Sequence, residues 1–259
     1  MDLGIHGKVA MVAAASKGIG LACAKMLSQE GCRVSICARN EERLGEACAE
    51  IGGTVRGYVA DVTASDDLER WAAHTAAELG PPDILITNTG GPPAGPLDQM
   101  TDEQWQSGFH ATIMNVVRLV RLVAPGMADR GWGRIVHITS LVAKEPSAML
   151  PISSTLRMGL QALVRLQGRQ YAPAGVTVNA VLPGHTLTDR QTHLADLRSQ
   201  REGIGISEAM ALQALSIPMG RIAEPDEIAA AAVFLCSQQA AYVTGTSLLV
   251  DGGLVAGAG

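Results

Sequence analysis

The chain of 259 residues is 47% hydrophobic and 17% charged, and its formal net charge is −5. This composition excludes a disordered protein, and the length suits one large α/β domain or two small ones. No run of Lys and Arg exceeds two residues, and no uninterrupted apolar run approaches the ~18 residues of a membrane helix, so we expect neither a nucleic-acid nor a membrane partner. Because the first residues lack a secretory pattern, we expect a cytoplasmic protein.

Strand and helix patterns alternate along the whole chain. Short apolar runs predict strands over residues 8–14, 33–38, 55–61, 83–88, 133–140, 176–182 and 247–250. Helical patterns lie between them, over residues 18–30, 41–51, 65–79, 101–127, 151–171 and 225–236. This alternation predicts a Rossmann-type doubly wound fold, with a seven-stranded parallel sheet flanked by helices. We expect a single domain over residues 1–259.

Two helix starts carry capping signals. Ser65 is predicted to cap the third helix, and Thr101 with Gln104 forms the sequence of a capping box. Residues 185–216 show no strand pattern and mixed charge.

The turn after the first strand favours an anion site. Ser16, Lys17, Gly18, Ile19 and Gly20 follow an apolar run and open a helix. A strand, a glycine turn and a helix present backbone N–H groups to a phosphate, and glycine permits a close backbone approach. In a parallel sheet, ligands bind beyond the carboxyl ends of the strands, so residues just after each strand are the candidates for a site.

Motifs at those strand ends carry a family resemblance. The glycine turn, Asp61-Val62, Thr87-Asn88-Thr89-Gly90, the run from Gly133 to Ser140 and the run from Gly175 to Gly184 stand in order along the chain. With them, nearly the whole chain resembles the short-chain dehydrogenase/reductase family, and most closely its 3-oxoacyl-carrier-protein reductases. The resemblance implies a nicotinamide dinucleotide held by Ser16, Lys17, Gly18, Ile19, Gly20, Arg39, Asp61, Val62, Asn88, Gly90, Pro183, Gly184 and Thr186. It also implies a homotetramer or dimer, a substrate lid over residues 185–216 and no metal site.

The sequence departs from the family where the chemistry lies. Ser140 retains the family's catalytic serine, but Ser153 stands at the position of the tyrosine and Arg157 at that of the lysine. Thr112 stands at the position of the family's asparagine, with Asn115 one turn away. In the cofactor turn, Ala13-Ala14 replaces Thr-Gly, and we expect Ala14 to be tolerated only at a negative φ.

Three hypotheses follow from these departures. The first is an NADP(H)-dependent oxidoreductase that interconverts a small carbonyl compound and its alcohol, with Ser140, Ser153 and Arg157 as its site. A 3-oxoacyl compound is one candidate for that carbonyl substrate. Its proton would come from a water held by Ser140 and Ser153, from Lys144 or from His185. The second is a lyase or isomerase in which Arg157 and Ser140 stabilise an oxyanion. The third is a cofactor-sensing or partner-binding protein without turnover.

The cofactor preference rests on charge. Ala38 stands where NAD-preferring relatives carry an acid, Arg39 follows it, and Lys17 lies in the glycine turn. Two cations without an acid suit a 2′-phosphate, so we expect NADP(H) rather than NAD(H). Ordinary surface cations would give the same pattern. The five cysteines form no C-x-x-C pair, and we expect them to be reduced and mostly buried.

Overall fold

A computed structural model describes residues 2–257; residues 1 and 258–259 of the predicted domain lie outside the described part. Seven parallel strands form one sheet in the order β3-β2-β1-β4-β5-β6-β7. Their bounds are β1 Val9–Val12, β2 Arg33–Ala38, β3 Val55–Val59, β4 Ile84–Thr87, β5 Gly133–Ile138, β6 Val176–Pro183 and β7 Ser247–Val250. The order reverses between β1 and β4, which is the point where such sheets bind ligands. The predicted fold class is confirmed.

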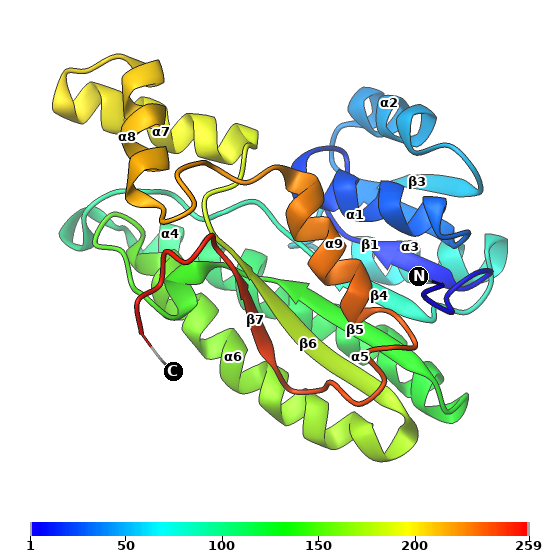
Figure 1. Ribbon diagram of the computed structural model, residues 1–259. Coiled ribbons are helices and arrows are strands. Elements are labelled where there is room, and N and C mark those ends of the chain that lie inside the picture. The colour runs from blue at the N-terminus through cyan, green and yellow to red at the C-terminus, as the bar shows by residue number, and fades with distance from the viewer. Residues whose placement is uncertain (1, 258–259) are drawn as a thin grey trace.

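Helices cover both faces of the sheet (Figure 1). One face carries α1 Gly18–Gln29, α2 Glu41–Ile51 and α9 Pro225–Leu235, and the other carries α3 Ser65–Glu78, α5 Asn115–Asp129 and α6 Pro151–Tyr171. The remaining helices are α4 Asp102–Phe109, α7 Asp189–Glu202 and α8 Ile206–Ser216, with short turns η1 Leu97–Gln99, η3 Leu141–Ala143 and η4 Ala172–Ala174.

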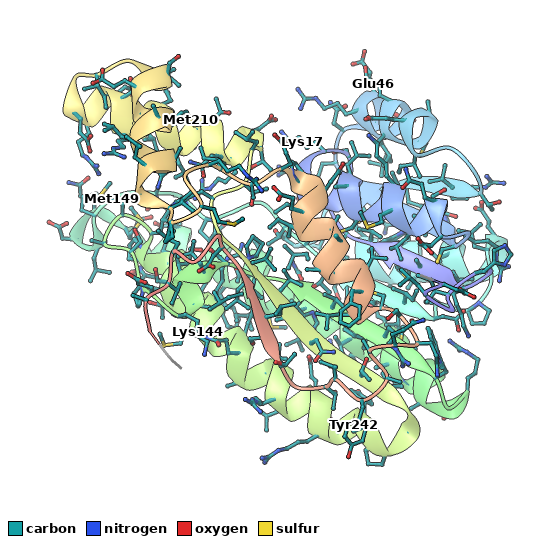
Figure 2. All side chains as sticks on the ribbon, viewed as in Figure 1. Lys17, Glu46, Lys144, Met149, Met210 and Tyr242 are labelled. Carbon is teal, nitrogen blue, oxygen red and sulfur yellow. The ribbon has the colours of Figure 1, made fainter. Side chains whose placement is uncertain are left out.

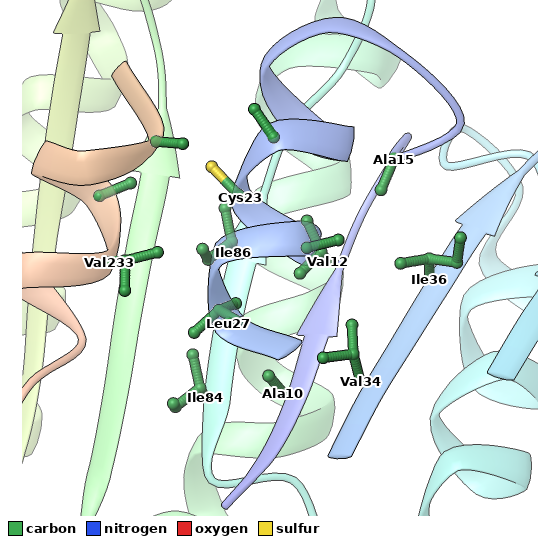
Figure 3. Close-up of a cluster of buried hydrophobic side chains, with 14 of the residues drawn as sticks. Ala10, Val12, Ala15, Cys23, Leu27, Val34, Ile36, Ile84, Ile86 and Val233 are labelled. Carbon is green, nitrogen blue, oxygen red and sulfur yellow. The ribbon is translucent and has the colours of Figure 1, made fainter. Parts of the chain in front are cut away.

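The core consists of apolar side chains between the sheet and these layers. On the α1 side, Val12, Leu27, Ile36 and Ile86 are fully buried together (Figure 3). Strands buried on both faces read as continuous apolar runs, which is why β1 is apolar throughout and β4 is apolar up to its last residue, Thr87. This double packing fixes the strand ends, and therefore the groups that follow them.

The long predicted helix over residues 101–127 is interrupted. The capping box of Thr101 and Gln104 forms as predicted, but one π-helical turn, η2 His110–Met114, separates α4 from α5. The stretch Asp102–Asp129 is long and apolar enough to cross a membrane by length and composition. Its apolar residues Leu119, Val120 and Val123 are buried in the core facing the sheet, which accounts for its apolar character. Arg118 and Arg121 interrupt its apolar run, so an uninterrupted run of ~18 residues does not occur there.

Two further local expectations differ from the structure. Ser65 is the first residue of α3 and not its cap, because Ala64 holds the cap position and offers no side-chain acceptor. Residues 185–216 contain two helices, α7 and α8, which pack on each other and stand away from the sheet layers (Figure 1).

Candidate functional site

The glycine turn follows the expected path with one alanine under strain. Ala14 has φ 49°, the left-handed region, although we expected a negative value. A Cβ clash with the carbonyl group disfavours this region for residues other than glycine. The Asn88 side chain holds the strained residue, since Nδ2 donates to the Ala14 carbonyl over 3.2 Å. A Cβ on Gly20 would lie 2.7 Å from the same carbonyl, so α1 requires glycine there.

Lys17 has an acidic partner that the sequence order concealed. Its ammonium group pairs with the carboxylate of Asp189, the first residue of α7. Figure 2 shows Lys17 between the start of α1 and α7. Lys17 is therefore paired with an acid from α7, whereas position 38 at the end of β2 is an alanine, as the cofactor prediction requires. Arg39 is exposed at the end of β2 and remains a candidate for a 2′-phosphate.

The other predicted cofactor residues lie at neighbouring strand ends. After β3, the Asp61 carboxylate accepts hydrogen bonds from the backbone and hydroxyl of Thr63, both 2.8 Å long, and Val62 packs against the core. After β4, Gly90 is exposed. After β6, the Thr186 hydroxyl donates to the Gly184 carbonyl. The parallel sheet thus brings these residues to one edge.

Helix α6 positions the two substituted catalytic residues on one face. Arg157 is 6% exposed, and Ser153, four residues earlier, is also buried. Arg157 Nε donates to Ser153 Oγ over 3.1 Å, and its Nη1 donates to the carbonyl of Ile138 at the end of β5. Burial lowers the pKa of Arg157 to about 10, which leaves it a cation at neutral pH.

Ser140 follows β5 directly and begins η3. Its Oγ accepts a hydrogen bond from the backbone of Val142, so its own proton stays available for another acceptor. The Ser153 hydroxyl is likewise an acceptor toward Arg157 and keeps its proton available.

The π-helical turn opens a small polar cavity beside Arg157. The cavity is lined by Thr87, Asn88, Thr89, Thr112, Asn115, Val116, Ile138, Arg157 and Leu160, and its volume of about 10 Å³ suits one water molecule. Thr112 Oγ1 and Asn115 Oδ1 are buried without a hydrogen-bond partner in the described structure. Asn115, one turn beyond the family position, therefore shares this cavity with Thr112. The sequence spacing alone assumes a regular helix and could not place both there.

The two alternative proton donors differ in their surroundings. His185 Nδ1 lies 3.2 Å from Gln191 Oε1, and Nε2 lies 2.6 Å from Gln213 Nε2. Both ring nitrogens are thus engaged, and burial lowers the pKa of His185, which disfavours the protonated ring. This arrangement does not favour His185 as a proton donor. Lys144 is half-buried at the end of η3.

The structure also brings Arg190, a cation of the predicted lid over residues 185–216, to the loop beside the site. Its Nη2 donates to the carbonyl of Pro92 over 2.6 Å, in the loop after β4. A larger cavity of about 410 Å³ lies nearer α1, lined by Gly18, Leu21, Ala22, Lys25, Leu187, Thr188, Asp189, Thr192, Pro225 and Asp226. Of the predicted cofactor residues, this lining includes Gly18.

The cysteines behave as expected. Cys23, Cys32, Cys37 and Cys236 are buried and unpaired, and Cys48 is half-buried. Burial raises the pKa of Cys23 and of Cys37 to about 12, so both remain protonated thiols. Among residues 2–257, no group of three or more His, Cys, Asp or Glu could hold a metal ion.

Known proteins match the chain over nearly its full length. A family model described as enoyl-(acyl carrier protein) reductase matches residues 13–255. A putative ketoacyl reductase of Streptomyces coelicolor is 34% identical over 95% of this chain and 97% of its own length. The 3-oxoacyl-acyl-carrier-protein reductase of Vibrio cholerae is 32% identical over 97% of this chain and 99% of its own.

Solved structures agree with the sequence relatives. A variant of actinorhodin polyketide ketoreductase with NADPH has a TM-score of 0.92 and 33% identity, covering 95% of this chain and 97% of that one. A short-chain oxidoreductase of Pseudomonas aeruginosa, described as containing an atypical catalytic centre, has a TM-score of 0.90 and 32% identity, covering 98% of this chain and all of that one. With the parallel sheet, the glycine turn and Ser140, these matches show that the chain belongs to the short-chain dehydrogenase/reductase family.

Proposed function

We propose that the chain is an NADP(H)-dependent oxidoreductase that interconverts a small carbonyl compound, such as a 3-oxoacyl compound, and its alcohol. The observation that supports this most is Arg157, a buried cation beside Ser153 at the cofactor edge of the sheet. The match to a ketoreductase solved with NADPH supports the choice of cofactor.

The cofactor edge fits a dinucleotide. Helix α1 has no side-chain cap, so its first N–H groups are available for a pyrophosphate. Gly20 lets the start of α1 pack directly against Ala14 and Ala15, which keeps the helix close to the end of β1. The residues that would hold the cofactor are Ser16, Lys17, Gly18, Ile19, Gly20, Arg39, Asp61, Val62, Asn88, Gly90, Pro183, Gly184 and Thr186. NADPH, when bound, supplies the hydride.

Arg157 takes the electrostatic part of the reaction. Negative charge develops on the carbonyl oxygen as the carbon is reduced, and a fixed guanidinium in a dry site stabilises that charge. Its bonds to Ser153 Oγ and to the Ile138 carbonyl orient it without neutralising it. Arginine stays protonated, so Arg157 binds and polarises but does not transfer the proton.

The hydroxyls of Ser140 and Ser153 orient the carbonyl oxygen. An aliphatic hydroxyl is too weak an acid to replace the family's tyrosine. The alkoxide that forms as the hydride arrives, stabilised by Arg157, therefore takes its proton from a water held by these two hydroxyls, and the hydroxide left behind is neutralised by exchange with solvent. Residues 185–216 cover this edge as a substrate lid within a single domain.

Calorimetric titration of the protein with NADPH and with NADH tests the cofactor. We expect micromolar NADPH binding and much weaker NADH binding, because Arg39 pairs with the 2′-phosphate. The variant Arg39→Ala should lose most of this preference, whereas Arg43→Ala, on the first turn of α2, should keep it. Absence of binding by either dinucleotide would contradict the proposal.

Turnover tests the site. In a screen of small carbonyl compounds with NADPH, Arg157→Ala should abolish turnover, while Arg165→Ala, two turns along α6 and exposed, should leave it unchanged. Activity of Arg157→Ala equal to the wild type would exclude the role given to Arg157. NADPH binding with no oxidation of NADPH in the wild type would leave the lyase and binding-protein alternatives.

A further inference from the structure

Buried arginines in this fold differ in how their donors are used. Arg134 is buried, and its guanidinium donates to the carbonyls of Ser237, Gly133 and Gly175 while it stacks on Trp132. This is a structural arginine whose charge is met by carbonyl dipoles. Arg157 is equally enclosed but has one carbonyl and one hydroxyl as partners. Since a guanidinium carries five N–H donors, Arg157 retains unused ones.

Arg190 is the second cation with unused donors near this site. It is half-buried, and its one protein hydrogen bond within residues 2–257 goes to the Pro92 carbonyl. Arg198 and Arg201 on the same helix both pair with Glu202, and the Lys17 ammonium of the glycine turn pairs with Asp189 of that helix. In the described part of the chain, neither Arg157 nor Arg190 forms an ion pair with a carboxylate.

The loop after β4 contacts Arg190 and also lines the cavity beside Arg157. Thr89 lines the cavity beside Arg157, and Gly91 and Pro92 hold Arg190. A Cβ on Gly91 would lie 2.8 Å from Arg190 Nε, so the guanidinium rests directly on the loop backbone. The positive charge of Arg190 also lowers the pKa of Arg157, beyond the larger effect of burial. Two like charges, one buried and one half-buried, therefore lie close to the same loop, and neither is paired with a carboxylate in the described part of the chain.

An unpaired buried charge is costly, and a second like charge adds to that cost. An anionic ligand group removes both costs on binding. A planar carboxylate also matches the forked donors of a guanidinium.

We propose that Arg190 binds the carboxylate of the substrate, so that the enzyme acts on an oxo acid whose carbonyl oxygen lies at Arg157. This inference rests on the proposed function, which places the carbonyl at Arg157, and it adds the substrate class. Arg190 is then a specificity-determining residue contributed by the lid.

The cofactor phosphates are the competing source of negative charge. They are expected at the start of α1, where Lys17 lies, whereas Arg190 contacts the loop after β4. This separation favours the substrate, and the experiment distinguishes the two sources.

The test uses pairs of small oxo acids and their neutral amides, with acetoacetate and acetoacetamide as one pair and pyruvate and pyruvamide as another. Each compound is titrated by calorimetry into the wild-type protein, with and without saturating NADP⁺, and assayed with NADPH. We expect at least one acid to bind about 30-fold or more tightly than its amide, as removing one partner of an enclosed charge pair costs at least that much. Failure of the acids to bind better than their amides would overturn the inference.

Three variants assign the effect. Arg190→Met should bring acid and amide to within about threefold of each other, because the cation is lost and the apolar stem is kept. Gly91→Ala should weaken acid binding in the same direction by displacing the guanidinium, whose flexible end can move without unfolding the loop. Arg201→Met removes one cation from the same helix and should keep the preference of the wild type.

The binding and turnover measurements distinguish failure of the carboxylate site from failure of the proposed reaction. A rise in the Kd for NADPH in Arg190→Met, with acid preference unchanged, would assign Arg190 to the cofactor and overturn the inference. Acid preference in binding without any NADPH oxidation would support the anion site while contradicting the proposed reaction. Thermal unfolding of each variant shows whether it is folded, and Arg190→Lys, which keeps the charge, should recover part of the preference if Arg190→Met is unstable.

Discussion

Ala14 shows at the scale of one residue how the cofactor turn differs from the family pattern. The residue has φ 49°, where an alanine Cβ is crowded, and the neighbouring Ala13 does not have a positive φ. Ala14→Gly should therefore raise the free energy of unfolding by about 1 kcal/mol, because the strain exceeds the entropy cost of glycine. Urea unfolding measures this change.

The adjacent alanine is the matched control for that variant. Ala13 is fully buried, so Ala13→Gly removes a packed methyl group and adds freedom to the unfolded chain. It should lower stability by about 1 kcal/mol, opposite in sign to Ala14→Gly. If both glycine variants are destabilised alike, Ala14 is not strained.

His137 is a second residue whose surroundings decide its properties. The ring is buried between Thr87 Oγ1, 2.8 Å from Nδ1, and Gln167 Oε1, 3.0 Å from Nε2. Burial lowers the pKa of His137 to about 4, despite the opposing effect of the Gln167 hydrogen bond. A histidine in the unfolded chain has a pKa near 6.5. Between the two pKa values the unfolded chain therefore binds a proton at His137 that the folded chain does not bind.

Stability should therefore fall as pH falls through the window from about 6.5 to about 4, and this contribution is fully present above it. Between pH 7 and pH 5 the loss due to His137 is about 2 kcal/mol. Urea unfolding at both pH values should show a smaller loss for His137→Gln than for the wild type. His193→Gln, at an exposed position of α7, should keep the loss of the wild type, and equal losses in all three proteins would exclude this account.

At the scale of the elements, the sequence predicted those helix and strand bounds that depend on the local residue pattern. The bounds of α6 and β7 agree with the prediction, because Pro151 opens the helix at its first residue and because β7 is a short apolar run between glycines. The π-helical turn was not predictable, since its extra residue per turn leaves no mark in apolar spacing. Because of that turn, both Thr112 and Asn115 line the cavity beside Arg157.

The contact between α1 and α7 is also beyond local pattern, because Lys17 and Asp189 are 172 residues apart. Both side chains are largely exposed, so the ion pair contributes at most about 1 kcal/mol to stability. The effect of Asp189 on the affinity for NADPH should be larger. Its carboxylate repels the cofactor phosphates, and it pairs with the Lys17 ammonium that would otherwise bind them. Asp189→Asn should therefore tighten NADPH binding several-fold with little change in Tm.

Calorimetry with NADPH measures this effect. Asp196→Asn is the control, because it removes an acid from the same helix that hydrogen-bonds to Gln200 and not to Lys17. Weaker NADPH binding in Asp189→Asn would mean that this carboxylate helps to form the cofactor site.

At the scale of the whole molecule, the site is a property of the sheet. Residues 20, 61, 88, 140 and 184 follow different strands and meet because all seven strands are parallel. The sequence could predict this gathering from the alternation of strands and helices. It could not predict that Lys17 pairs with Asp189 or that Arg190 contacts the Pro92 carbonyl, because both contacts depend on the position of α7.

The outer face of α6 carries the expectation of a homo-oligomer. Met158 and Leu166, eight residues apart, lie on one stripe of the helix and are 47% and 64% exposed. Leu122 on the neighbouring α5 is also exposed. Apolar side chains that gather on one surface mark an interface more often than scattered ones do.

We therefore expect a dimer or tetramer in solution, and Leu166→Asp should dissociate it by placing a charge in the interface. Light scattering after size-exclusion chromatography measures the mass. Leu215→Asp is the matched control, because Leu215 on α8 is 77% exposed and lies on a different surface. A wild-type mass equal to the 27.0 kDa of one chain would contradict the expectation, and dissociation by Leu215→Asp alone would move the interface from α6 to α8.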